Sequence, residues 1–511
     1  MRSLIGAFLI AACSVATSST NALATGASSR IKVNTNGTIK IGVLYSPTSL
    51  NPATSTAGLD ALYLSMVYDT LIGVNPKNGD LQPMLATSWH VAGVSRLQWD
   101  VFLRKGVKFQ DGTPLTAQAV VDYSKAYLAA GDIGNALQYV TNVSAVGKYE
   151  VVYRLSQQNS QLPFGLASKG GMIPSPTAVA KEGSSFATNP VGAGPYSFTS
   201  EVAGSSYSFT RFNGYWNNAH QPRIQNITFD VFQSDTSLVT AIQSGDVNIA
   251  SGVQATDVST LKSNPGLVTA VGPGTHFNMA YFNSNVAPFT NVDLRIAFNL
   301  ALNRQAMMTA ATDGTGQVQT EFTLPGQPGY VKSLAPLFPY NPTKAAQLVK
   351  QAGYPNGVSM TCYEQPGQGY DIIGPIIVAE EAAVGINVTL LPGGPTVVAP
   401  FFTKNTSPCL LAQGSGNGDP VYANLGLWSQ SYYNASHTDF GADKDFVSLF
   451  RTYKASQQAQ LFYNINLAFQ KNPGFSVFYT APFVNVYQKS VGGWIISPLT
   501  LDNWQSLYYK G

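Results

Sequence analysis

Three short apolar runs decide the fold class of this chain: Ser359–Tyr363 (SMTCY), Ile386–Leu390 (INVTL) and Cys409–Ala412 (CLLA). Each run has the length of a strand, and Gly or Pro follows within a few residues, which is typical of a strand end. A helical pattern separates the first two runs. Because strands that alternate with helices form parallel sheets, we expect an α/β fold whose ligand site lies beyond the carboxyl ends of these strands.

The alternation of helices and strands starts near Asn291, which can cap one helix, and Asn341-Pro342 opens another that ends at Gly353. Earlier in the chain, helices are expected from Leu62 to Leu71, after a Thr116 cap and before Gly245. Strands in this first half are expected over residues 39–44, 97–103, 148–155, 196–199, 207–212, 224–232 and 247–250.

The composition excludes several classes of protein. The chain has 511 residues, 44% of them hydrophobic, which suffices for two or three domains with proper cores. Only 11% are charged, against about 25% in a typical soluble domain. The 26 Phe, 26 Tyr and 6 Trp argue against disorder, and the lack of any basic run argues against a nucleic-acid partner.

The sequence contains no catalytic motif. It has no G-x-S-x-G elbow and no phosphate loop, and its four histidines (His90, His220, His276 and His437) lie too far apart for a local metal motif. We therefore expect a protein that is not an enzyme and needs no cofactor or metal. Because catalytic triads also assemble from distant residues, a secreted hydrolase remains an alternative.

Residues 1–24 are typical of a secretory signal peptide. Arg2 precedes the apolar run Leu4–Ala12, and Ala22-Leu23-Ala24 offers a cleavage site, after which residues 25–38 are expected to form a flexible linker. The alternative is a lipoprotein signal in which Cys13 carries a lipid anchor. We favour soluble export, because the segment before Cys13 is short for such a signal. Either way the mature protein is expected in the periplasm or at the cell surface.

Two further cysteines, Cys362 and Cys409, lie in two of the apolar runs. Export permits a disulfide, and the two sulfur atoms can meet if these runs are neighbouring parallel strands. Two unpaired, buried thiols are the alternative, because free cysteine is often buried.

A series of sequence blocks spans nearly all of residues 39 to 490. The most specific block is Trp99–Pro114 (WDVFLRKGVKFQDGTP), and others are Leu44–Pro52, Met66–Leu71, Gly192–Tyr196 and Asp293–Ala297. In this order the blocks resemble the extracellular solute-binding proteins, family 5, which serve peptide- and nickel-type ABC importers. Most of these residues are aromatic packing or turn residues, so they identify the architecture better than the ligand.

The resemblance implies a two-lobe fold of the periplasmic-binding-protein type (type II), with mixed sheets flanked by helices. Lobe I would comprise residues 39–275, with a subdomain inserted over about 61–190, and lobe II residues 276–484, before residues 485–511 return to lobe I. The crossings near residues 276–284 and 480–486 would form a hinge, and a cleft between the lobes would close over the ligand.

The resemblance also places ligand-binding residues in lobe II. Peptide-binding relatives have a Trp seven residues and an Asp four residues before a proline, and the Asp pairs with the amino terminus of the peptide. In this chain Gln413 and Gly416 occupy these positions before Pro420. Dipeptide binders also have an Arg for the carboxyl terminus, where this chain has Gln365.

These departures predict a largely uncharged ligand, or a peptide whose ends protrude into water, because an enclosed charge without a partner is costly. The amides of Gln365, Gln413 and Asn417 suit amide or sugar hydroxyl groups. Asp419 is either a ligand acceptor or a turn residue. In lobe I, Tyr45 either stacks on the ligand or packs in the core. The resemblance implies that three residues face the cleft: Thr54, Ser55 and Thr56.

The sequence thus predicts a receptor that captures a small peptide-like, oligosaccharide or similar uncharged solute for the permease and ATPase of an ABC importer. The membrane would be reached only through the permease or a lipid at Cys13. The alternative among binding proteins is a sensor that presents its closed form to a signalling receptor. With only 26 Asp and Glu in the chain, weak acid denaturation is also expected.

Overall fold

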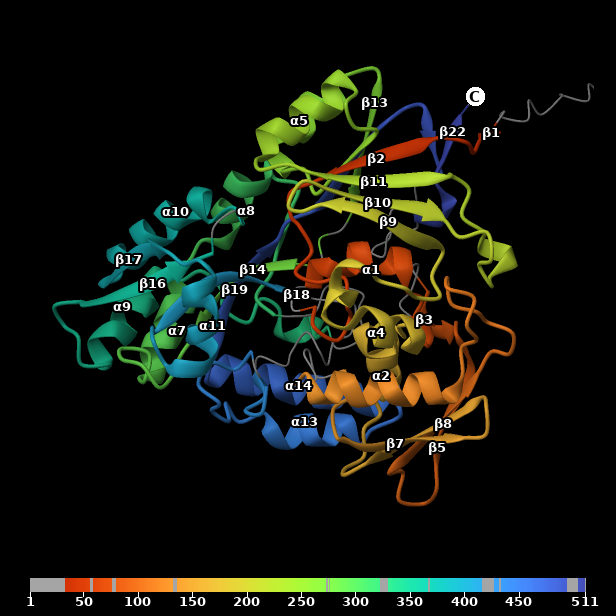
Figure 1. The fold of residues 1–511 in the computed structure, drawn as a ribbon. Helices are drawn as coiled ribbons and strands as arrows, with labels where there is room; N and C mark the ends of the chain where they lie inside the picture. Colours follow the sequence, from red (N-terminus) through yellow and green to blue (C-terminus); the bar gives the residue numbers. More distant parts are fainter. Residues whose placement is uncertain are drawn as a thin grey trace, which may run out of the picture.

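Two mixed β-sheets flanked by helices form two lobes in the computed structural model of this protein (Figure 1). The structure describes residues 33–55, 58–75, 80–131, 136–272, 274, 276–321, 330–365, 368–415, 427–431, 433–493 and 504–510. The predicted signal peptide, Cys13 and four predicted site residues lie outside these ranges: Thr56, Gly416, Asn417 and Asp419.

Lobe I is built on a seven-stranded sheet. Its strands, in spatial order, are β13 (Leu267–Gly272), β20 (Phe483–Gln488), β12 (Ile249–Ser251), β2 (Thr38–Val43), β11 (Asn226–Val231), β10 (Ser206–Arg211) and β9 (Tyr196–Val202). The central β2 runs parallel to β11 and β12 and buries Ile39 and Ile41. Helix α5 (Asp235–Ser244) crosses this strand so closely that a Cβ at Gly42 would meet Leu238.

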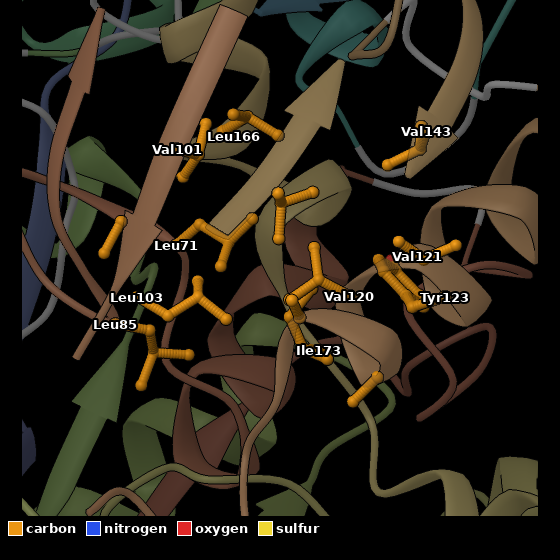
Figure 2. Close-up of a cluster of buried hydrophobic side chains, with 14 of the residues drawn as sticks. Leu71, Leu85, Val101, Leu103, Val120, Val121, Tyr123, Val143, Leu166 and Ile173 are labelled. Atoms are coloured by element: carbon orange, nitrogen blue, oxygen red, sulfur yellow. The ribbon is translucent and has the colours of Figure 1, made fainter. Parts of the chain in front are cut away.

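A smaller antiparallel sheet lies between β2 and β9 in chain order. Its strands are β5 (Ala86–Ala92), β6 (Gln98–Leu103), β8 (Glu150–Leu155) and β7 (Val140–Val146). Helix α2 (Ala117–Ala129) begins at Thr116, whose side chain accepts a hydrogen bond from the Ala119 N–H as the sequence predicts. Apolar residues of this helix, including Val120, share one core with Val101 and Leu103 of β6 (Figure 2). We call the elements from β3 (Ile72–Val74) to η2 (Lys169–Gly171) the inserted subdomain.

Lobe II is built on a six-stranded sheet. Its strands, in spatial order, are β15 (Gln317–Val318), β19 (Phe475–Thr480), β14 (His276–Phe282), β18 (Cys409–Ser415), β16 (Val358–Glu364) and β17 (Ile386–Pro392). Its helices are α7 (Val292–Ala301), α8 (Arg304–Thr312), α9 (Pro342–Gln351), α10 (Tyr370–Ala383), α11 (Pro395–Lys404), α13 (Asp443–Phe450) and α14 (Ala455–Lys471). The predicted caps Asn291 and Asn341 accept hydrogen bonds from the first turns of α7 and α9.

The three apolar runs that predict the α/β fold are neighbouring strands. β16 runs parallel to both β17 and β18, whereas β14 is antiparallel to β18, so the sheet is mixed. Cys362 of β16 lies opposite Cys409 of β18, with 4.8 Å between the Cα atoms, and a disulfide joins them.

Two crossings connect the large sheets. The first runs from β13, which ends at Gly272, to β14, which begins at His276, and the second runs from Thr480 of β19 to Phe483 of β20. The crossings touch, because a Cβ at Gly274 would overlap the carbonyl oxygen of Ala481. A glycine is therefore needed at this position.

Two boundaries differ from the sequence prediction. The helix expected to reach Leu71 ends sooner, since α1 comprises Ala61–Val67. Residues Val33–Asn34, predicted as linker, form β1 and pair with β22 (Tyr508–Lys510), and β2 begins at Thr38. The remaining helices and strands are β4 (Leu81–Pro83), α3 (Leu162–Leu166), α4 (Pro176–Glu182), α6 (Val258–Lys262) and β21 (Val491–Gly492).

Candidate functional site

The strand ends of the lobe II sheet meet beside the crossings. β14 begins directly after the first crossing, and because it is antiparallel to β18, His276 and Asn278 lie opposite Ser415 and Gln413. The parallel strand β16 ends at Glu364, next to Leu411 of β18. The carboxyl ends of β16 and β18 thus lie at the edge of the sheet where the chain passes to lobe I (Figure 1).

Four carboxamide residues lie at this edge, and we call them the carboxamide cluster: Asn278, Gln365, Gln368 and Gln413. The backbone N–H of Gln365 donates to the carbonyl of Leu411 (2.9 Å), which continues the β16–β18 pairing by one residue. The next free donor on β18, the Gln413 N–H, bonds to the side-chain oxygen of Gln368 (2.8 Å). The Gln413 amide nitrogen lies 3.5 Å from the side-chain oxygen of Asn278.

The structure therefore places the backbone of Gln365 beside β18, near Gln413, and adds Asn278 and Gln368. Ligand contact by Gln365 and Gln413 stays a prediction. No local signal identifies Asn278, because its place beside Gln413 depends on the pairing of strands 135 residues apart. Gln368 lies close to Gln365 in sequence, so its amide character is a signal that the sequence does contain. Neutral amides supply donors and acceptors to a ligand but no compensating charge.

Glu364 is the acid at the end of β16. A Cβ at Gly374 of α10 would lie 3.2 Å from a carboxylate oxygen of Glu364, so this side chain lies on the α10 side of the strand. Partial burial, followed by the charge of Asp371, raises the pKa of this carboxyl group.

The lobe I residues lie in the loop between β2 and α1. Thr54 is exposed, and its hydroxyl lies 2.8 Å from that of Ser49. The half-buried Tyr45 donates its hydroxyl to the carbonyl of Leu59 (2.9 Å). Ser55 is fully buried, and its hydroxyl donates to the carboxylate of Asp60 (2.6 Å). The ligand contacts predicted for these three residues stay predictions, and the Ser55 hydroxyl already has a structural partner.

Asp60 holds this loop in place. The buried carboxylate of Asp60 also accepts hydrogen bonds from the N–H (2.9 Å) and the hydroxyl of Thr48. The ammonium of Lys169, from η2, donates to the carbonyl of Ser55 (3.1 Å), and burial lowers the pKa of Lys169 although the charge of Asp60 opposes this shift. Two residues of the loop, Thr48 and Ser55, are thus held by one acid and one base.

The described residues contain no group of three or more His, Cys, Asp or Glu side chains arranged to hold a metal ion. Among the helices in the described ranges, none combines the length and the apolar character that a membrane span requires.

Comparisons with known proteins agree with this architecture. The glutathione-binding protein GsiB of Shigella flexneri is 30% identical over 323 residues, which are 62% of this chain and 61% of that relative. GsiB of Pectobacterium atrosepticum is 26% identical over 475 residues, 90% of this chain and 91% of that protein. DppA from Helicobacter pylori, solved with the peptide STSA, superposes with a TM-score of 0.83 at 20% identity, over 93% of this chain and 98% of that one.

This likeness shows the type II periplasmic-binding fold, two lobes with mixed sheets. The sequence profile of the bacterial extracellular solute-binding proteins, family 5 (middle region), matches residues 80–436, well over half of the chain. The ordered blocks found in the sequence, the two sheets and their double crossing all fit this match, and the chain belongs to the bacterial extracellular solute-binding proteins, family 5.

Proposed function

We propose that this protein is the substrate-binding receptor of an ABC importer and that it captures a peptide-like, largely uncharged solute between its lobes. The observation that carries the proposal is the carboxamide cluster at the strand ends beside the two crossings. Ligands of open α/β sheets bind beyond the carboxyl ends of the strands. Relatives named for glutathione binding and a structural neighbour bound to the peptide STSA support a peptide-type ligand.

The proposed mechanism uses the crossings as a hinge. With the ligand bound, lobe II rotates onto lobe I, so a surface made from both lobes exists only in the loaded receptor. A permease that binds this surface selects the loaded form, because a ligand can shift the equilibrium only toward the state it binds better. No covalent chemistry is part of this mechanism.

We further propose that the protein works outside the cytosol, as its family does. Cleavage after Ala24 leaves a soluble protein, whereas lipidation of Cys13 leaves an anchored one. The intact mass of the natively expressed protein distinguishes the two. We expect the mass of residues 25–511, and a mass that includes acyl chains would contradict soluble export.

Two measurements test the ligand class. Mass spectrometry of whatever copurifies with the native protein identifies candidates, and calorimetry then compares neutral, end-blocked peptides with free-ended dipeptides and oligosaccharides. We expect the tightest binding for the end-blocked peptides. Tight binding of free-ended dipeptides alone would contradict an uncharged ligand.

A variant of the carboxamide cluster tests whether the ligand binds there. Gln413→Glu removes the donor to Asn278 and adds a charge, so affinity for a neutral peptide should fall about tenfold or more. Gln305→Glu is the matched control, because Gln305 is exposed on α8, outside the cluster. Equal affinities in the two variants would show that the ligand does not contact this edge.

A further inference from the structure

The inserted subdomain of lobe I contacts the end of helix α13 in lobe II. Helix α13 belongs to lobe II because Phe446 and Leu449 pack in one core with Phe277 of β14. Its last residues nevertheless lie against the loop that follows β8 of the inserted subdomain. In Figure 1, α13 lies toward the small sheet, at the far end of the molecule from the sheet of lobe I.

Ser160 binds the carboxyl end of α13. Its backbone N–H donates to the carbonyl of Phe450 (2.6 Å), and its hydroxyl donates to the carbonyl of Leu449 (3.1 Å). The last four carbonyl groups of a helix have no partner within the helix. Ser160 thus satisfies the Phe450 carbonyl, from a position 289 residues away from Leu449. It also adds a second hydrogen bond to the Leu449 carbonyl, which already accepts from the Thr452 N–H (3.0 Å). Both groups can bond to water when the lobes separate, so the contact is reversible.

The loop that presents Ser160 is held rigidly by its own subdomain. The side chain of the buried Asn159 accepts from the Gln161 N–H (2.8 Å) and donates to the carbonyl of Gln138 (2.9 Å). The Asn159 carbonyl accepts from the indole nitrogen of Trp99 (3.0 Å). Little conformational entropy is therefore lost when Ser160 meets α13.

The inserted subdomain and lobe II each pack one tyrosine against the core of the other. Tyr139 of the inserted subdomain packs at the rim of the lobe II core, with its ring centroid 5.6 Å from that of Phe450 and 6.3 Å from that of Trp428. Tyr453, which follows α13, packs at the rim of the subdomain core, 6.2 Å from Trp99 and beneath the Arg96 guanidinium (5.0 Å). Tyr139 has a left-handed backbone (φ 66°), a conformation that is uncommon for a bulky non-glycine residue.

One feature opposes this contact. The hydroxyl of Tyr453 is buried in the contact and has no hydrogen-bond partner. A polar group buried without a partner destabilises the state that buries it. Favourable ring and hydrogen-bond contacts are thus partly opposed by an unfavourable desolvation.

We propose that Ser160, Tyr139, Tyr453 and the end of α13 form a latch that holds the two lobes closed and sets the rate at which the solute is released. This inference rests on the proposed function for its biological role. The latch contacts involve residues of the protein alone, so they also act in the ligand-free chain. The ring and hydrogen-bond contacts of the latch favour the closed form. The buried hydroxyl of Tyr453 disfavours that form, so the lobes can still separate.

The test compares two variants with opposite expected effects. Tyr453→Phe removes the unpartnered hydroxyl and should shift the open–closed equilibrium toward the closed form about fivefold or more. Tyr139→Ala removes the ring contacts and should shift it toward the open form. We expect X-ray scattering of the ligand-free protein to give a smaller radius of gyration for Tyr453→Phe than for wild type, and a larger one for Tyr139→Ala.

Tyr340→Phe and Tyr340→Ala are the matched controls, because Tyr340 is 52% exposed in lobe II. Ser160→Ala loses one hydrogen bond and keeps the backbone N–H, so it should shift the equilibrium slightly toward the open form. It replaces Tyr139→Ala in the test if that variant does not fold. Radii that do not differ from the controls, or that change in the same direction in both variants, would overturn the latch. Since this scattering test needs no solute, a receptor that binds no peptide would refute the proposed function and leave the latch standing.

Discussion

At the scale of single residues, Asp69 shows how burial alone changes the charge of this protein. Asp69 is 5% exposed, and it accepts a hydrogen bond from the indole nitrogen of Trp216 (2.6 Å). Burial raises the pKa of its carboxyl group to about 7, although the bond from Trp216 opposes the shift. The folded protein therefore keeps a proton on Asp69 at pH values where the unfolded chain has released it.

This difference predicts a pH dependence. Between pH 4 and about 7 the folded state binds more protons than the unfolded state at this residue, so stability falls as the pH rises through that window. Asp69→Asn, which mimics the protonated form, should remove about 2–4 kcal/mol of this decline. Urea denaturation at several pH values measures it, with the exposed Asp122→Asn as control. Identical pH profiles in wild type and Asp69→Asn would contradict the prediction.

Gly274 is the second residue with a specific consequence, because the two crossings touch there. Gly274→Ala places a Cβ against the backbone of Ala481, which must move, and we expect a loss of about 1–3 kcal/mol. Chemical denaturation measures the loss. Gly394→Ala is the matched control, because nothing lies within 4 Å of a Cβ at Gly394. A Gly274→Ala protein as stable as the control would show that the crossings can separate freely.

At the scale of elements, the disulfide between β16 and β18 lies next to the carboxamide cluster, a few residues earlier along the same two strands. Cys362 and Cys409 are both fully buried, and their bond closes a loop of 47 residues. The bond ties the two strands whose ends carry Gln365 and Gln413. It therefore stabilises the register on which the cluster depends.

The double variant Cys362→Ala/Cys409→Ala should lose about 2–4 kcal/mol of stability, because the unfolded chain regains the entropy of the open loop. Denaturant titration of oxidised wild type and the variant measures this loss. Thiol titration of the unfolded, unreduced protein should find neither cysteine free. Two reactive thiols would contradict the bond and restore the alternative of unpaired, buried cysteines.

At the scale of the whole molecule, the carboxylates of the described residues accept hydrogen bonds from hydroxyl and backbone N–H groups more often than they form ion pairs with cations. Within the described ranges the structure shows two ion pairs, His90–Asp100 and Lys181–Glu182. Burial is the main cause of a raised carboxyl pKa at six described positions: Asp69, Asp230, Asp235, Glu364, Glu380 and Glu381. Among the described residues, hydrogen bonds from Ser175 and then Thr113 lower the pKa of Asp111 despite its partial burial.

This balance predicts tolerance of acid. A carboxyl group with a raised pKa in the folded state stabilises the protein as the pH falls through that pKa, which is about 7 at Asp69 and Asp235. A carboxyl group with a lowered pKa has the opposite effect, and so does His276, whose pKa burial lowers. We expect the melting temperature at pH 4.5 to equal or exceed that at pH 7.5. Differential scanning calorimetry checks this, and a steep fall of the melting temperature toward pH 4 would contradict it.

Local sequence signals predicted much of the fold because they act between residues within about one helical turn of each other. Thr116, Asn291 and Asn341 cap their helices, and Gly245 ends α5 in the left-handed conformation, as predicted. The end of α1 was predicted too late because apolar spacing continues to Leu71, although the backbone of Tyr68 is already extended. Apolar periodicity reports burial, and it does not report where a helix stops.

The amino-acid sequence by itself determined the family, the two-lobe α/β architecture and the neutral residues Gln365 and Gln413 at the ends of predicted strands. Only the tertiary structure decided that Asn278 lies beside Gln413, that Asp60 takes the hydroxyl of Ser55, and that Ser160 binds the end of α13. The physical reason is the range of the forces involved. Caps and periodicity act between neighbours in the chain, whereas these contacts follow from which surfaces pack once both lobes have formed.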